Sequence, residues 1–253
     1  MFIQFRNLRR PGVVHFQTDR QGGVSQNEYC SMNMGYSAGD AYANVMANRS
    51  ALARTLGIGL ERFVFCRQVH GAHVHIVTAA DSGRGVDLLR HDTIQDTDAL
   101  VTNVPGLMLC IKTADCIPLF MYDPCKRCVG IAHVGWRGAA KNLPVGIVRT
   151  LQEHYHSDPS DLIVVLGVGI GGCCYQAAES IYRLFHDEVT PNSRGPYPID
   201  LKSIIAKQLL AAGVPGEQVE ISRICSACNH DRHFSARATG GKCGYSLSGI
   251  GLL

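Results

Sequence analysis

Three residues whose side chains can do chemistry stand where apolar stretches of the sequence end. His70 precedes a glycine in "QVHG", Cys116 closes "TADC", and His133 lies in "IAHVGW". One thiolate and two imidazoles form a suitable ligand set for Zn²⁺, and three protein ligands leave a fourth position for water. Water bound at such a position becomes a nucleophile near neutral pH. The three positions are far apart and match no local zinc motif, so spacing alone does not establish the site.

Each of these residues also has an ordinary structural explanation. A histidine in an apolar strand is commonly a hydrogen-bonded core residue, and a cysteine between Asp115 and Ile117 is commonly a small buried side chain. Asp115 itself fits two roles. It is a candidate to orient an imidazole or a substrate hydroxyl, or it is a turn residue bonded to its own backbone. These alternatives stay open on the residues alone.

The composition is that of a folded chain without a strong charge bias. Of 253 residues, 46% are hydrophobic and 18% are charged, which is enough for a large core. The net charge is +3 and no run of Lys or Arg forms a basic arm, so we expect no nucleic-acid partner. Neither a signal peptide nor a stretch apolar enough to cross a bilayer is evident, which predicts a cytoplasmic protein without membrane association.

The chain contains 11 cysteines, which a reducing compartment keeps as thiols, ligands or nucleophiles. Two C-x-x-C pairs, of the kind that forms a four-cysteine zinc site, stand far apart at Cys125/Cys128 and Cys225/Cys228. The adjacent Cys173 and Cys174 are candidates for redox sensitivity, but a vicinal disulfide is strained and disfavoured in that compartment. Burial as small apolar side chains is the alternative for all of them. The sequence does not determine the role of these pairs.

The elements that must position these residues mix strands and helices without a regular βαβ rhythm. Extended runs separated by turns are predicted within residues 12–25, 62–77, 98–123, 128–136 and 161–170. Helical periods are predicted in residues 44–58, 137–155, 178–189 and 200–214, with Pro144 near the start of the second helix or kinking it. Most neighbouring strands are close enough for hairpins. We therefore predict an α+β fold, a single domain over residues 1–253 with a mixed β-sheet and flanking helices.

Longer stretches around the three residues resemble one family. "QVHG", "TADCIPLFMYDP" and "GIAHVGWRG" are similar to the motifs of the YfiH-type family, long labelled laccase-domain or multicopper polyphenol oxidase proteins and also described as purine nucleoside phosphorylases. The similarity extends to "DTDALVTNVPG" and "CSACNHDRHFSARATGGKCG" and covers nearly the whole chain. The resemblance implies the YfiH-like fold, which is similar to that of cysteine-dependent deamidase toxins. It also implies that the zinc ligands are His70, Cys116 and His133.

The resemblance places further residues at motif positions. Arg49 in "ANRS" and Arg137 in "GWRG" are candidates for clamping an anion, because a guanidinium fork fits phosphate oxygens; a structural ion pair is the alternative for each. Trp136 is a candidate for stacking on a purine and Asn33 for the pocket wall, with packing and a turn as the ordinary explanations. Asp98 keeps a family position but looks like a turn residue.

Several residues depart from the family's usual pattern, and none of them belongs to the metal trio. They are Val134, Gly171, Gln176 and Tyr245. The turn at residues 169–174 is expected to shape the substrate pocket. The departures therefore bear on substrate preference.

The function implied by the resemblance is that of a zinc enzyme acting on purine nucleosides and phosphate. It comprises phosphorolysis of adenosine, inosine, guanosine and 5′-methylthioadenosine, together with adenosine deamination. Zn²⁺ can activate water to attack C6 of adenine, or orient phosphate against C1′ of the ribose. The preferred nucleoside, the general acid for the leaving base and the oligomeric state are not determined by the sequence.

Two other activities stay open. Without metal, Cys116 and His133 form a thiolate–imidazolium pair able to attack an amide. For this chemistry the resemblance implies a Cys-His hydrolase that edits peptidoglycan precursors. The older label of copper polyphenol oxidase requires many clustered histidines, which the two HxH pairs of this sequence do not supply. Cu²⁺ is then an alternative metal for the same three ligands rather than evidence for a copper cluster.

Overall fold

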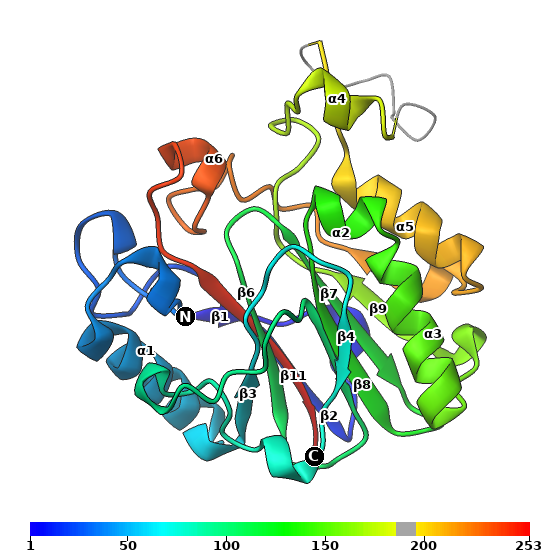
Figure 1. Ribbon diagram of the computed structural model, residues 1–253, viewed down its shortest axis with the longest axis horizontal. Coiled ribbons are helices and arrows are strands. Elements are labelled where there is room, and N and C mark those ends of the chain that lie inside the picture. Colours follow the sequence, from blue (N-terminus) through cyan, green and yellow to red (C-terminus); the bar gives the residue numbers. More distant parts are fainter. Residues whose placement is uncertain (186–195) are drawn as a thin grey trace.

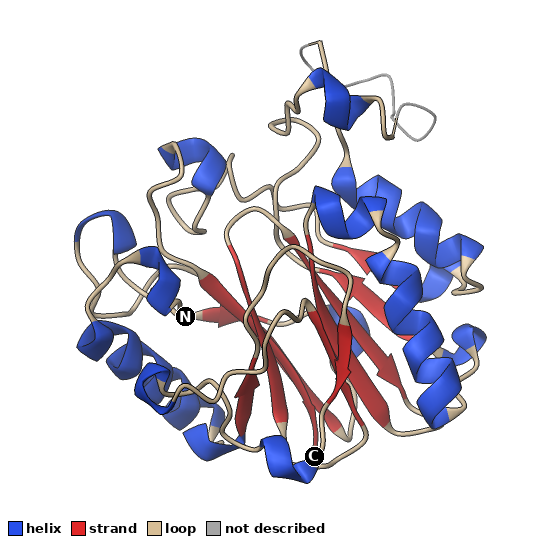
Figure 2. Cartoon of the chain, in the orientation of Figure 1, coloured by secondary structure: helices blue, strands red, loops and turns tan. Residues whose placement is uncertain are grey.

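Strands with alternating apolar residues build two mixed β-sheets. The computed structural model describes residues 1–185 and 196–253. Its strands lie at the centre and its helices outside them (Figure 2). The strand order is β1-β2-β11-β6-β3 in the first sheet and β10-β9-β7-β8-β5-β4 in the second.

The first sheet joins the two ends of the chain. It contains β1 (Phe2–Ile3), β2 (Val13–Thr18), β3 (Phe63–Phe65), β6 (Met108–Thr113) and β11 (Ser246–Leu252). The C-terminal strand β11 lies between β2 and β6 and is antiparallel to both, whereas β3 runs parallel to β6. This sheet is therefore complete only when the last residues of the chain are in place.

The second sheet is built around the hairpin of β7 and β8. β7 pairs antiparallel with both β8 and β9, while the outer pairs β4·β5 and β9·β10 are parallel. The strands are β4 (Val74–Ile76), β5 (Ala99–Thr102), β7 (Ile117–Asp123), β8 (Cys128–Val134), β9 (Ile163–Leu166) and β10 (Val219–Ile221).

The helices cover the two outer faces of the sheets. Helix α1 lies beside the first sheet, and α3 and α5 lie on the opposite side of the molecule, beside the second sheet (Figure 1). The helices are α1 (Tyr42–Leu56), α2 (Trp136–Ala140), α3 (Leu143–Tyr155), α4 (Glu179–Tyr182), α5 (Leu201–Ala211) and α6 (Ala236–Thr239). Within the described residues, no helix combines the length and the apolar character needed to cross a bilayer.

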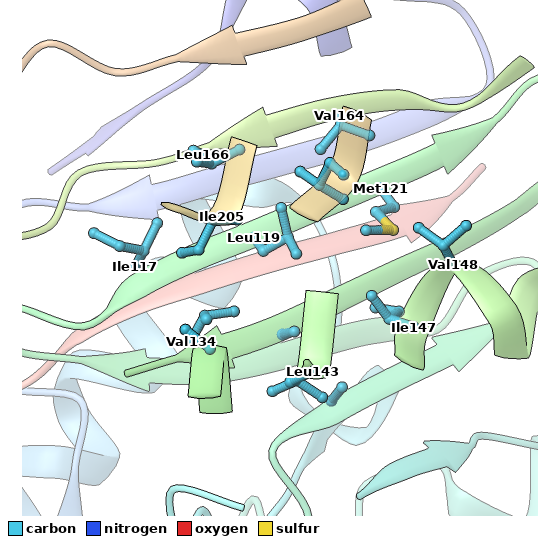
Figure 3. Packing of buried hydrophobic residues seen from close by; sticks show 14 of the residues in the cluster. Ile117, Leu119, Met121, Val134, Leu143, Ile147, Val148, Val164, Leu166 and Ile205 are labelled. Atoms are coloured by element: carbon cyan, nitrogen blue, oxygen red, sulfur yellow. The ribbon is translucent and has the colours of Figure 1, made fainter. Parts of the chain in front are cut away.

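Alternation along β7 explains how the layers hold together. Successive side chains of a strand point to opposite faces. Leu119 and Met121 belong to the cluster that includes Ile147 of α3 and Ile205 of α5 (Figure 3). Phe120 belongs instead to the cluster that fills the space between the two sheets. A third cluster packs α1 against the outer face of the first sheet. The result is a four-layer arrangement of helix, sheet, sheet and helix.

The predicted α+β class is confirmed, and the strands divide between two mixed sheets. The helix predicted in residues 137–155 is two helices, α2 and α3, because Asn142 adopts a left-handed conformation with φ of 56° and Pro144 lies in the first turn of α3. Within the helix predicted over 178–189, the structure has α4 at Glu179–Tyr182, and residues 186–189 lie outside the described residues. The single-domain extent of 1–253 stays a prediction.

Candidate metal centre and active-site cavity

His70, Cys116 and His133 come together although they belong to three separate segments. His133 is near the end of β8, where it pairs with Pro118 of β7, and Cys116 directly precedes β7. His70 lies in the loop between β3 and β4. The potential ligand atoms of the three residues all lie within 4.8 Å of one another. The two imidazole rings are 4.7 Å apart between centroids and are inclined at 77°.

This donor set fits a zinc ion. Tetrahedral Zn²⁺ takes thiolate at about 2.3 Å and imidazole at about 2.0–2.1 Å, so its ligand atoms are roughly 3.5 Å apart. The three ligand atoms lie within 4.8 Å of one another, so small side-chain movements would bring them to the separations that one ion requires. Three ligands of this kind leave a fourth position open toward a substrate or water.

Asp98 orients the His133 ring and holds the backbone of the loop that carries His70. Its Oδ1 lies 2.8 Å from Nδ1 of His133, which leaves Nε2 of that ring to act as the ligand atom. The same carboxylate accepts hydrogen bonds from the backbone N–H groups of Val69, His70 and Gly71, at 3.1, 3.0 and 2.6 Å. The side chain is fully buried. Burial raises the pKa of Asp98, but the hydrogen bonds from His133 and these amides outweigh it, and the pKa is lowered.

We expected Asp115 to orient an imidazole or a substrate hydroxyl. It lies beside the active-site cavity, but its carboxylate is hydrogen-bonded to loop residues and not to an imidazole. Its Oδ1 accepts a hydrogen bond from Ser226 Oγ at 2.6 Å, and its Oδ2 accepts one from the Arg237 backbone N–H at 2.7 Å. Its carbonyl accepts a hydrogen bond from the Ile170 N–H. The φ of 92° places Asp115 in the left-handed region, which is costly for a residue with a side chain. The orienting role toward the imidazole belongs to Asp98, and Asp115 ties three loops together at the cavity.

The three residues are coupled electrostatically. Burial raises the pKa of the Cys116 thiol, but the charge and hydrogen bonds of His133 and His70 lower it to about 6. Burial lowers the pKa of His133, but the Cys116 thiolate and Asp98 raise it to about 9. In the absence of metal, both shifts favour a thiolate beside an imidazolium, and the thiolate is the form that binds a metal.

The backbone beside Cys116 is shaped for close approach. A Cβ atom added to Gly135 would lie 2.9 Å from Cys116 Sγ and 3.2 Å from Cδ2 of His70, which is too close for an ordinary contact. His70 itself has a φ of 58°, in the left-handed region. Non-glycine residues in this region cluster at functional sites, where surrounding contacts hold the strain.

A cavity of about 340 Å³ opens beside the three residues. This is within the roughly 300–1,000 Å³ common for small-molecule sites. Arg137 is exposed at its rim, with its guanidinium carbon 4.4 Å from the centre of the Trp136 ring. The lining includes His70, Asp115, Cys116, Trp136, Arg137, Ile170, Tyr175 and Arg237.

A second, smaller cavity of about 220 Å³ also borders the trio. It is also lined by His70 and Cys116, and by His133, Lys112 and Tyr245. Burial lowers the pKa of Lys112 to about 8.

Arg49, which we expected to clamp an anion, is not brought to either of these two cavities. Its side chain is 2% exposed, and its N–H groups donate to the backbone carbonyls of Met34, Gly85 and Val86. Its guanidinium lies 4.0 Å from the ring centre of Phe65. Because these donors face carbonyl oxygens inside the protein, the contacts of Arg49 are structural.

Asn33, which we expected in the pocket wall, also lies away from the cavities. It is fully buried, and its side-chain amide donates to the Gly35 carbonyl and to Asp40. Its Oδ1 accepts from the backbone N–H groups of Gly35 and Tyr245. These bonds hold a turn and connect it to the segment before β11.

Arg237 and the orienting role of Asp98 were missed from the sequence. Arg237 extends from the start of α6 and donates to the carbonyls of Cys174 and Gln176 at 3.0 and 2.9 Å, which fixes the turn that carries Tyr175. It stands in a polar loop without a periodic pattern, and its one signal is that it falls within the family-like stretch "CSACNHDRHFSARATGGKCG". Asp98 had one signal, since it directly precedes a predicted strand and retains a family position.

The sequence matches a known family along most of its length. A family described as "Multi-copper polyphenol oxidoreductase laccase" matches residues 14–253. A protein of Geobacillus stearothermophilus named purine nucleoside phosphorylase YlmD is 37% identical over 248 residues, covering 95% of this chain and 90% of the relative. A Bacteroides thetaiotaomicron protein named purine nucleoside phosphorylase is 32% identical, covering 94% and 91%. A prokaryotic protein named adenosine deaminase RL5 is 29% identical, covering 94% of each.

Solved structures have the same fold. The crystal structure of YlmD from Geobacillus stearothermophilus matches with a TM-score of 0.91 and 35% identity, covering 98% of this chain and 94% of the other. That of the Bacillus licheniformis hypothetical protein YfiH matches with a TM-score of 0.90 and 31% identity, covering 100% and 99%.

Proposed function

This chain belongs to the family described as multi-copper polyphenol oxidoreductase laccase, the YfiH-type family that its motifs resemble, and on that premise we propose that it is a zinc-dependent purine nucleoside phosphorylase with adenosine deaminase activity. Relatives at 37% and 32% identity carry the first name, and one at 29% identity carries the second. The proposed substrates are adenosine, inosine, guanosine and 5′-methylthioadenosine, with phosphate or water as the second reactant.

The observation that carries this proposal is the meeting of His70, Cys116 and His133 beside a cavity of nucleoside-compatible size, which His70 and Cys116 line. When bound by these three ligands, Zn²⁺ supplies a Lewis acid with an open position, which activates water or orients a phosphate oxygen. Cu²⁺ is the alternative metal for the same ligands. Asp98 keeps the His133 ring and the His70 loop in place for this purpose.

The residues around the trio are suited to binding phosphate and to binding the nucleoside. Arg137 is exposed at the cavity and, within the described part of the chain, forms no ion pair with a carboxylate, so its guanidinium is available for phosphate. Trp136 lines the cavity, where a purine can stack on its ring in exchange for the Arg137 guanidinium that lies 4.4 Å from the ring centre. Asp115, as a hydrogen-bond acceptor on the same wall, is suited to a ribose hydroxyl.

A product assay tests the proposal. Purified protein is incubated with adenosine, with and without phosphate, and adenine, ribose-1-phosphate and inosine are separated and quantified. We expect the first two only with phosphate and inosine without it, and we expect His133→Ala to abolish all three. The matched control is His73→Ala, an exposed histidine that does not line either cavity, which is expected to retain the wild-type rate. Identical traces from wild type and His133→Ala would eliminate the purine reaction.

A second candidate is favoured by one specific observation. Cys116, His133 and Asp98 form a chain of nucleophile, base and orienting carboxylate, the arrangement used by cysteine hydrolases. In this alternative the metal-free Cys116 thiolate attacks an amide, and His133 transfers the proton to the leaving amine. A metal-bound thiolate is a poor nucleophile, so the two functions exclude each other at any instant.

Alkylation separates these two candidates. Iodoacetamide labelling of Cys116 is followed by peptide mass spectrometry in protein that has been chelated and in protein that has been reloaded with Zn²⁺. Protection of Cys116 by zinc, together with zinc-dependent nucleoside turnover, supports the first candidate. Activity on amide substrates that rises after chelation supports the second.

The copper oxidase activity that the family's label describes is not favoured. A copper cluster needs several imidazole ligands close together. Within residues 1–185 and 196–253, the only group of potential ligands that contains histidine is the trio itself. We therefore retain copper only as an alternative ion at this site.

A further inference from the structure

Four cysteines outside the candidate active site lie together on two neighbouring turns. They are Cys173 and Cys174, in the turn after β9, and Cys225 and Cys228, in the turn after β10. All four sulfur atoms lie within 4.8 Å of one another. Sγ of Cys228 is 3.6 Å from that of Cys173 and 3.3 Å from that of Cys174, which are themselves 3.9 Å apart.

These separations suit a metal ion better than a disulfide. A tetrahedral zinc–thiolate centre with Zn–S distances of about 2.3 Å places its sulfurs about 3.8 Å apart, and the three measured separations lie on both sides of that value. A disulfide requires about 2.05 Å between sulfurs. All four residues are free thiols in the structure.

The surroundings of Cys225 stabilise a thiolate. The Gly171 N–H donates to Cys225 Sγ at 3.2 Å. Burial raises the pKa of Cys225, but N–H donors of Cys228, Gly171 and Ala227 lower it to about 7. The Lys202 ammonium group, which donates to the carbonyls of Ser222 and Ile224, also lies close enough to interact with this thiolate. Positive groups of this kind reduce the repulsion among several thiolates at one site.

The two turns meet because of strand pairing. β9 and β10 are parallel neighbours, so the chain leaves both at the same edge of the sheet. An isolated bridge between Gly169 and Cys225, with the Ser226 N–H donating to the Gly169 carbonyl, continues this pairing into the turns. The cysteines are therefore brought together by backbone contacts that do not depend on the thiols.

We propose that Cys173, Cys174, Cys225 and Cys228 bind a second Zn²⁺, in a closed tetrahedral site that is structural rather than catalytic. Four protein ligands leave no open position for substrate. Binding forms four Zn–S bonds and releases to solvent the protons of those thiols that were not already ionised, with no change of oxidation state. The ion joins the turn after β9 to the turn after β10.

This site differs from the four-cysteine site suggested by the sequence. That hypothesis paired Cys225 and Cys228 with Cys125 and Cys128, which the structure places elsewhere. Cys125 is exposed in the β7–β8 turn near Asp123 and Asp161, and Cys128 is buried with its Sγ 3.4 Å from Ser157 Oγ. The adjacent pair at 173–174 supplies the missing two thiols instead.

The second zinc would hold the wall of the active-site cavity. Tyr175 follows Cys174 directly and lines the cavity, and Arg237 donates to the Cys174 carbonyl. Ser226, between the two cysteines of the C-x-x-C turn, donates to Asp115. A metal that fixes both turns therefore fixes Tyr175 and the loop contacts of Asp115.

Metal binding is tested in a full-length variant that lacks the first site. His70→Ala/His133→Ala removes two ligands of the trio and leaves the four cysteines intact. The variant is purified with a thiol reductant, its zinc content is measured, and the zinc is exchanged for Co²⁺. We expect one metal ion per chain, a thiolate-to-cobalt charge-transfer band, and X-ray absorption with sulfur at about 2.3 Å around zinc.

A matched pair of substitutions locates that metal. In the same background, Cys228→Ser removes an exposed ligand, and Cys125→Ser removes an exposed cysteine of the other C-x-x-C pair. We expect Cys228→Ser to reduce bound metal well below one ion per chain and Cys125→Ser to leave it unchanged. If Cys228→Ser fails to fold, the X-ray absorption of the His70→Ala/His133→Ala variant still tests whether the metal has only sulfur ligands.

Three results would overturn the proposal. The first is that the His70→Ala/His133→Ala variant binds no metal even with excess zinc. The second is that the bound ion has nitrogen or oxygen ligands. The third is that the Cys228→Ser and Cys125→Ser variants contain equal amounts of metal. None of these measurements involves nucleoside turnover, so the second zinc site and the proposed activity can fail separately.

The effect on the cavity wall has its own measurement. Amide hydrogen exchange is compared in the His70→Ala/His133→Ala variant with and without zinc. We expect removal of zinc to accelerate exchange in residues 169–176 and 222–229 and to leave α1 unchanged. Unchanged exchange in both turns would show that the ion does not hold this wall.

Discussion

At the scale of single residues, Asp98 connects two of the three proposed metal ligands. One carboxylate contacts the His133 ring and three consecutive backbone amides of the loop that carries His70. Two ligands from different segments thus depend on one side chain that is not itself a ligand. Carboxylates in this position raise the basicity of a ligating imidazole and hold its tautomer.

We expect Asp98→Asn to weaken zinc binding at the trio by about 10–100-fold, because the amide keeps the size but not the charge of the carboxylate. Competition with a chromogenic chelator measures the affinity, in a Cys228→Ser background that removes the second site. The control is Asp96→Asn, two positions away, where the carboxylate forms an exposed ion pair with Arg67. Equal affinities in the two variants would contradict the role given to Asp98.

Gly135 provides a second test at this scale. We expect Gly135→Ala to displace Cys116 or His70, since the new methyl group would lie 2.9 Å from the sulfur, and so to lower both zinc affinity and nucleoside turnover. Gly146→Ala in α3 is the matched control, because nothing lies within 4 Å of its added carbon. That change is expected to stabilise the fold by about 0.5–1 kcal/mol. Retained zinc affinity in Gly135→Ala would show that the site accommodates the methyl group.

At the scale of elements, α1 shows how a motif arginine can serve the fold. Arg49 is on the inner face of this helix, and its guanidinium bonds the carbonyls of Met34, Gly85 and Val86. These carbonyls belong to loops on both sides of the helix in the sequence. The arginine therefore connects α1 to two loops, alongside Asn48 of the same helix, whose amide donates to the Ser31 and Asn33 carbonyls.

We expect Arg49→Met to lower the free energy of unfolding by about 3 kcal/mol or more, because buried carbonyls lose their donors at about 1–3 kcal/mol each. Urea denaturation measures it. Arg54→Met, an exposed arginine of the same helix, is the control and should change stability by less than about 1 kcal/mol. A rise in KM for phosphate in Arg49→Met without a loss of stability would restore the anion-binding role.

At the scale of the whole molecule, the packing between the two sheets includes a buried histidine. His15 of β2 is 1% exposed, its Nε2 accepts the Phe5 N–H at 2.8 Å, and its ring packs against Phe5 and Phe120. Protonation would remove this acceptor and place a charge among aromatic rings. Burial lowers the pKa of His15 to about 4, together with the charge of Arg9 and against the opposing charge of Glu220.

This histidine predicts acid sensitivity in a defined range. The unfolded chain binds a proton at His15 below pH of about 6.5, whereas the folded chain does so only below about 4, so stability falls as the pH drops between these values. The loss from this group amounts to about 2 kcal/mol between pH 7 and pH 5. Urea denaturation of wild type and His15→Gln at both pH values isolates the contribution of His15, because the other titrating groups are the same in the two proteins. Parallel pH dependence in the two proteins would contradict the assignment.

The sequence by itself determined those helices and strands that depend on residues close together in the chain. The helical period of residues 44–58, closed by a glycine, predicts α1 with its end at Gly57, whose φ is 67°. The apolar runs around the "TADC" turn predict β6, β7 and β8, and Cys116 and His133 lie at the ends of β7 and β8. Periodicity and turn residues report local backbone preference, and these elements are set by it.

The tertiary structure alone decided which distant polar groups meet. Asp98 contacts His133, and Arg49 contacts the carbonyl of Val86. Cys173 and Cys174 lie beside Cys225 and Cys228. Each of these contacts joins residues that are far apart in the sequence. Such contacts follow from how strands pair and layers stack, as when parallel β9 and β10 end side by side. Apolar alternation specifies which face of a strand is buried, but not which strand lies next to it, so the polar partners at the strand ends could be identified only in the folded chain.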